Sequence, residues 1–136
     1  MSTSRITTHV LDTTAGRPAE GVSVSLFARD AMADGDADAA VGNASAGAAD
    51  AAAADGWRLV EASVTDADGR ATRLGPETLT AGEYRLRFDT GAYFAARSVD
   101  TFFPEVVVTF AVADDGRHCH VPLLLSPFAY STYRGS

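Results

Sequence analysis

The sequence predicts an all-β protein, a two-sheet antiparallel sandwich of seven or eight strands with one short helix. Outside one acidic segment, apolar and polar residues alternate with a period of two, which is the pattern of half-buried strands. The alternating stretches are short, and turn residues separate them. A parallel α/β fold would need helices between the strands, and the sequence offers almost none.

The first two strands show the alternation most clearly. In residues 6–11, Ile6 and Val10 fall on one face, and His9 falls on the other. A Gly-Arg-Pro turn follows, and the alternation returns in residues 22–27 with valine and leucine against serine. These two segments therefore each predict a strand with one apolar face.

The rest of the chain repeats this pattern after the acidic segment. The further strand candidates cover residues 57–65, 84–89, 106–112, 119–124 and 129–134. Breakers at residues 68–69, 81–82, 114–116 and 126–127 separate them. Residues 90–97 lack the alternation and predict the one helix, with Tyr93 and Phe94 turned toward a sheet.

The whole chain, residues 1–136, is expected to form a single domain with an insertion at about residues 31–56. That segment consists almost entirely of Ala, Asp, Gly, Asn and Ser. It cannot bury enough apolar surface to offset the entropy lost on ordering, so we expect a flexible loop.

Composition excludes several classes of protein. The net charge is -7, with 11 arginines and no lysine, which argues against nucleic-acid binding. No apolar run is long enough to span a membrane and no signal peptide is recognisable, so a cytoplasmic location is expected. The single cysteine, Cys119, can form neither an internal disulfide nor a thiolate metal site.

Three histidines are the candidates for chemistry. His118 and His120 lie two residues apart on a predicted strand, so both side chains share a face, while His9 lies on the first strand. Each could be an ordinary surface histidine, and the pair could be half of a metal site. No further ligand motif supports a metal, and no Gly-x-Ser-x-Gly elbow supports a serine nucleophile, so neither a metal nor a cofactor is expected.

Several motifs, in order along the chain, resemble those of the 5-hydroxyisourate hydrolases of the transthyretin-like family. They include THVLD near the start, TDADGR in the middle, HVPLLLSP near the end and the tail YSTYRGS. The matching segments are residues 8–12, 16–19, 65–70, 82–88, 102–106, 120–127 and 130–136. The resemblance therefore covers nearly the whole chain except residues 31–56.

The resemblance implies a transthyretin-like sandwich that opens 5-hydroxyisourate in urate (purine) catabolism. It implies a homotetramer, a dimer of dimers, with active sites in the channel between dimers. The implied catalytic set is His9, Arg70, His120 and Ser136, the substrate-binding set is His9, Arg70 and Tyr133, and Arg134 and Gly135 have supporting roles. His118 is not the motif histidine and is expected to be a bystander.

These residue types suit hydrolysis of a cyclic amide. A histidine that titrates near neutrality can take a proton from water, and a guanidinium can bind a carbonyl or oxyanion in a bidentate way. The choice of base between His9 and His120 stays open, because protonation depends on neighbours. The alternatives are a non-catalytic transthyretin-like carrier of small ligands and a sandwich domain that decorates larger proteins. The paired histidines and the YRGS ending favour the hydrolase.

Overall fold

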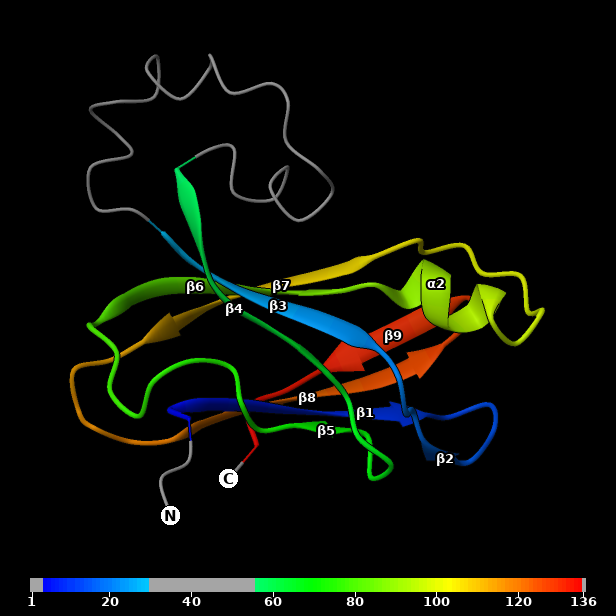
Figure 1. The fold of residues 1–136 in the computed structure, drawn as a ribbon, viewed down its shortest axis with the longest axis horizontal. Helices are drawn as coiled ribbons and strands as arrows, with labels where there is room; N and C mark the ends of the chain where they lie inside the picture. Colours follow the sequence, from blue (N-terminus) through cyan, green and yellow to red (C-terminus); the bar gives the residue numbers. More distant parts are fainter. Residues whose placement is uncertain (1–3, 30–55, 136) are drawn as a thin grey trace.

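The computed structural model describes residues 4–29 and 56–135, and these form two stacked β-sheets with one short helix (Figure 1). The elements are β1 (Ile6–Asp12), β2 (Arg17–Pro18), β3 (Ser23–Arg29), β4 (Trp57–Val64), β5 (Arg70–Ala71), β6 (Gly82–Phe88), α2 (Thr90–Ala95), β7 (Val106–Val112), β8 (Cys119–Ser126) and β9 (Ala129–Thr132). Each predicted strand is present to within one or two residues. The predicted all-β sandwich is confirmed.

We name the two sheets A and B. Sheet A has the order β2-β1-β8-β9, and β5 also pairs with β1; sheet B has the order β4-β3-β6-β7. All pairings in sheet B are antiparallel, as predicted. In sheet A, however, β1 and β8 run parallel. The sequence pattern could not reveal this, because side chains alternate with a period of two in both kinds of pairing.

Two further strands, β2 and β5, were not predicted. Each is only two residues long, too short to show alternation. Both pair antiparallel with β1, so β1 has neighbours along both edges.

The core lies between the sheets and follows the predicted parity. On β1, Ile6 and Val10 are fully buried, while His9 on the other face is half-buried. On β8, Cys119, Val121 and Leu123 face the core, so the neighbouring His120 points outward. This parity fixes which side chains of sheet A face away from the sandwich.

The helix α2 begins after Asp89, whose carboxylate accepts a hydrogen bond from the Ala92 amide. It is shorter than the predicted 90–97, and it buries Tyr93 and Phe94 against the sandwich as expected. The Tyr93 hydroxyl donates to the buried Asp12 carboxylate at 2.8 Å. Burial and this hydrogen bond raise the pKa of Tyr93 to about 12. Among the described residues, no helix is long and apolar enough to cross a membrane.

The predicted insertion at residues 31–56 lies almost wholly outside the described residues. Its flanking strands are neighbours in sheet B, where Arg29 pairs with Trp57. Residues 29 and 57, on either side of the insertion, are therefore adjacent in sheet B, and sheet A contains neither of them.

Candidate active site

The outer face of sheet A brings three of the predicted site residues together. His9 of β1 is the direct register partner of Arg70 of β5. On the other side of β1, Thr7 is the partner of His120 on β8. Register partners share a face, and Thr7 and His9 are two residues apart, so all four side chains lie on the same outer face.

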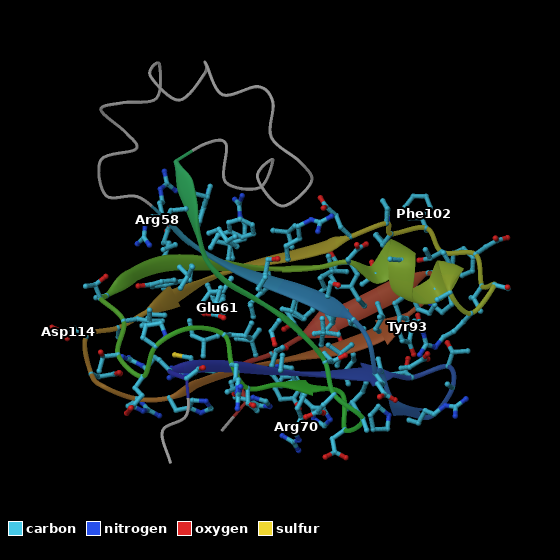
Figure 2. All side chains as sticks on the ribbon, viewed as in Figure 1. Arg58, Glu61, Arg70, Tyr93, Phe102 and Asp114 are labelled. Carbon is cyan, nitrogen blue, oxygen red and sulfur yellow. The ribbon has the colours of Figure 1, made fainter. Side chains whose placement is uncertain are left out.

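Arg70 lies at the edge of this face and points away from the core. Figure 2 shows its side chain on the opposite side of the molecule from Arg58 of β4. Arg70 is exposed, so its side chain can meet a ligand on this face.

A tight turn holds Arg70 in place. The Asp66 carboxylate accepts hydrogen bonds from the amides of Asp68 and Arg70, at 2.9 and 3.0 Å. The Gly69 carbonyl then accepts from the Val10 amide at 2.7 Å, which attaches the turn to β1. Gly69 has a φ of 75°, in the left-handed region. A side chain there would also meet the Val10 carbonyl oxygen, 2.4 Å from the position of its Cβ.

We therefore expect Gly69→Ala to destabilise the protein by about 1–3 kcal/mol or more, because the strained backbone and the clash add together. Gly116→Ala is the matched control. Gly116 also has a left-handed φ, of 70°, but nothing lies within 4 Å of the position that a Cβ would take there. Urea denaturation measures both variants, and equal losses would show that the contact with β1 is unimportant.

Thr7 lies between two histidines on the outer face. Its hydroxyl oxygen is 2.8 Å from His120 Nδ1 and 2.9 Å from His118 Nε2. The two imidazoles are nearly parallel, with ring centroids 6.3 Å apart and an interplanar angle of 20°. Thr7 itself is buried, whereas His118 is exposed and His120 is half-buried.

The environment of His120 favours its neutral form. Burial lowers the pKa of His120 below its ordinary value of 6.5, and the nearby charges of Arg70, His118 and His9 lower it further. At neutral pH the imidazole is therefore uncharged and able to accept a proton. That Arg70 and His9 affect the pKa of His120 agrees with their position on the same face of sheet A.

The tail runs back beside β8. The Gly135 amide donates to the His120 carbonyl at 2.8 Å. A Cβ on Gly135 would come within 2.6 Å of His120 Cδ2, so only glycine allows the tail to pass so close to the imidazole. Ser136 lies outside the described residues.

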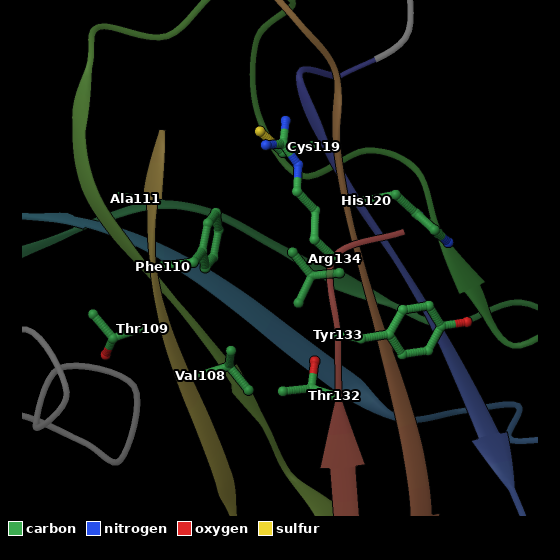
Figure 3. Close-up of a pocket in the computed structure, with 10 residues that line it drawn as sticks. Val108, Thr109, Phe110, Ala111, Cys119, His120, Thr132, Tyr133 and Arg134 are labelled. Carbon is green, nitrogen blue, oxygen red and sulfur yellow. The ribbon is translucent and has the colours of Figure 1, made fainter. Parts of the chain in front are cut away.

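The side chains of the tail point in alternate directions (Figure 3). Tyr133 extends to the same side of the sheet as His120 and is exposed. Thr132 extends to the other side, toward Val108 of β7, and Arg134 runs along β8 on that side, with its guanidinium near Cys119 in this view. Tyr133 is thus placed to reach a ligand on the outer face, and Arg134 is not.

Arg134 lines a cavity of about 260 Å³ between the edges of the two sheets. Valine, phenylalanine and cysteine side chains make up much of its wall, and it lies on the core side of β8. The rings of His120 and Tyr133 point away from it. His120 and Tyr133 nevertheless line part of its wall, so the cavity adjoins the outer-face site.

Metal binding gains no support from the geometry. In the part of the chain that the structure describes, no group of three or more His, Cys, Asp or Glu side chains is arranged to hold an ion.

Comparison with known proteins identifies the family. The model of the HIUase/Transthyretin family matches residues 6–135. The chain belongs to this family. It is 40% identical over 137 residues to the 5-hydroxyisourate hydrolase of Caulobacter vibrioides, covering 98% of this chain and 99% of the relative.

Solved structures of both branches of the HIUase/Transthyretin family resemble the chain. The 5-hydroxyisourate hydrolase of Klebsiella pneumoniae has a TM-score of 0.71 at 33% identity, covering 99% of this chain and all of the other. Sea bream transthyretin in complex with thyroxine has a TM-score of 0.76 at 28% identity, covering 96% and 94%. Fold similarity alone therefore does not separate an enzyme from a carrier, and the site residues must do so.

The structure places His9, Arg70, His120 and Tyr133 on one face and turns Arg134 away. Sequence reasoning missed Thr7, although its spacing of two residues from His9 places it on the same face. It also set His118 aside, and the structure shows His118 bonded to the hydroxyl that contacts His120.

Proposed function

We propose that this chain hydrolyses 5-hydroxyisourate to 2-oxo-4-hydroxy-4-carboxy-5-ureidoimidazoline in urate catabolism. The observation that carries the proposal is the cluster of His9, Arg70 and His120 on the outer face of sheet A, in a chain similar over nearly its whole length to 5-hydroxyisourate hydrolases. Two imidazoles and a guanidinium supply a proton acceptor and hydrogen-bond donors for opening a cyclic amide.

His120 is the proposed general base. Its neutral imidazole removes a proton from water. The resulting hydroxide oxygen attacks a ring carbonyl carbon of the substrate. A positioned base of this kind contributes about 10²–10⁴-fold to the rate. Its Nδ1 is bonded to Thr7, so Nε2 is the nitrogen left to face the water.

Arg70 and His9 stabilise the charge that develops on the carbonyl oxygen. They are adjacent register partners, so a single small substrate can contact both. The guanidinium presents two parallel N–H donors, which match a carbonyl or carboxylate oxygen pair. Tyr133 contributes a phenol from the tail, Gly135 lets the tail pass His120, and Ser136 is proposed to complete the catalytic set.

The proposed assembly is a homotetramer, a dimer of dimers, located in the cytoplasm. Support comes from the open position of the site: Arg70 and Tyr133 are exposed in the single chain. A neighbouring copy packed over the outer face of sheet A would exclude water and strengthen the polar contacts to the substrate.

A carrier function is the second candidate, because sea bream transthyretin, solved with thyroxine, has a similar fold. The outer face of sheet A argues against it. A carrier of an apolar ligand gains little from two histidines and an arginine, whose desolvation costs free energy.

The test is to add the protein to freshly made 5-hydroxyisourate and follow the ultraviolet decay. Acceleration over the spontaneous decay supports the hydrolase. Unchanged decay, together with saturable binding of thyroxine, would favour the carrier instead.

A further inference from the structure

Thr7 and His118 form a hydrogen-bonded chain with His120 that the roles above leave unused. The Thr7 hydroxyl contacts Nδ1 of His120 at 2.8 Å and Nε2 of His118 at 2.9 Å. Thr7 is 5% exposed, so little water competes for its hydroxyl. Thr7 and His120 are register partners on the parallel strands β1 and β8, and His118 directly precedes β8.

One hydroxyl between two imidazoles restricts where the protons lie. A threonine hydroxyl has a single proton and can donate to only one of the two nitrogens. The other nitrogen must then carry a proton and donate to the hydroxyl oxygen. The tautomers of the two neutral histidines are therefore linked.

This link allows two forms. In the first, His120 donates from Nδ1 to Thr7 and Thr7 donates to His118, which leaves Nε2 of His120 bare and able to accept a proton. In the second, His118 donates to Thr7 and Thr7 donates to His120, whose proton is then on Nε2. We call these the acceptor form and the donor form of His120.

We propose that Thr7 and His118 are positioning residues that set the form of His120, so that His120 acts as a base only while His118 is uncharged. A charged His118 carries protons on both nitrogens and must donate to Thr7, which holds His120 in the donor form. The inference rests on the proposed hydrolase function, since it assigns a task to that site.

The same chain carries the proton during the reaction. Nε2 of His120 takes a proton from water, and the hydroxide oxygen bonds to the substrate carbonyl carbon. The Nδ1 proton of His120 passes to Thr7 as the Thr7 proton passes to His118. His120, now in its donor form, gives its Nε2 proton to the ring nitrogen as the C–N bond breaks, and the extra proton of His118 returns through Thr7.

The surroundings of His120 disfavour its charged form. Burial is the largest of these effects, and Arg70 on β5, His118 just before β8 and His9 on β1 add to it. His118 is exposed and lines a shallow surface pocket with Arg5 and Glu77. Exposure leaves the His118 ring in contact with solvent, whereas His120 is half-buried.

Thr7→Val and Thr7→Ser provide the first test. Valine keeps the shape but removes the hydroxyl, and we expect kcat to fall about 10- to 100-fold with little change in KM. Serine keeps the hydroxyl and should restore most of the rate. The ¹⁵N chemical shifts of the His120 ring, recorded without substrate, should show a changed tautomer balance in Thr7→Val and an unchanged one in Thr7→Ser.

His118→Ala provides the second test through the acid limb of kcat/KM. Removing a nearby positive charge makes His120 easier to protonate, so electrostatics alone would move the limb to higher pH. The hydrogen-bond link predicts the opposite, a move of the acid limb to lower pH. In the unaltered protein a charged His118 prevents His120 from acting as a base, and in His118→Ala this block is absent.

Three results would overturn the proposal: an equal loss in Thr7→Ser and Thr7→Val, an unchanged tautomer in Thr7→Val, or an acid limb that stays or rises in His118→Ala. The ¹⁵N chemical shifts of the His120 ring are recorded without substrate, so they do not depend on whether the protein is an enzyme. If the unaltered protein fails to accelerate the decay, the hydrolase proposal fails, while the tautomer link between Thr7 and His120 is still decided by the spectrum.

Discussion

Replacing His120 by alanine is expected to lower kcat by about 10²–10⁴-fold, because the reaction then loses its general base. Alanine leaves no group that can take the proton from water, and it also removes the imidazole that Thr7 contacts. The measurement is the initial rate of 5-hydroxyisourate decay at saturating substrate, with the spontaneous rate subtracted.

His120→Gln separates the chemical loss from a structural one. Glutamine can still accept or donate a hydrogen bond toward Thr7, but it cannot act as a base near neutral pH. We expect it to be nearly as impaired as His120→Ala while unfolding in urea close to the unaltered protein. Substantial activity in the glutamine variant would remove His120 from the role of base.

Replacing Arg70 by alanine is expected to lower kcat/KM by about 10²–10³-fold, which is the usual effect of losing one donor to a developing oxyanion. Arg70→Lys should recover little of this. Lysine keeps the charge but lacks the planar pair of donors, and its ammonium would need a different approach to the same oxygen. Arg70 is exposed, so neither change should alter stability by more than about 0.5 kcal/mol.

Arg58→Ala is the matched control, since Arg58 is an exposed arginine on β4 of sheet B, on the opposite side of the molecule. It removes the same net charge from the protein without touching the outer face of sheet A, and its activity should equal that of the unaltered chain. If Arg70→Lys matches the unaltered protein, Arg70 serves only as a positive charge.

The strands were predictable because each has one apolar face. The alternation in residues 6–11 and 119–124 gave both the strands and the outward direction of His9 and His120. The alternation could not show which strands pair with each other in the sheets. The parallel pairing of β1 with β8 joins segments more than 100 residues apart, and no local pattern records such a pairing.

The candidate site depends on this register. His9 meets Arg70 only because the two-residue strand β5 pairs with β1, and Thr7 meets His120 only through the β1–β8 register. The alternation of side chains along the strand places His118 and His120 on the same face, so it could not show which of them belongs to the site. The family motif chose His120, and the structure adds that both histidines share the Thr7 hydroxyl.

The central claim is that His9, Arg70 and His120, from three strands, act together as one site on the outer face of sheet A. Its most direct test compares kcat of the double variant Arg70→Ala/His120→Ala with those of the two single variants. Groups that act as a unit are strongly non-additive, so the double variant should lose little more than His120→Ala alone. Fully multiplicative losses would mean that Arg70 and His120 act independently and would contradict the single site.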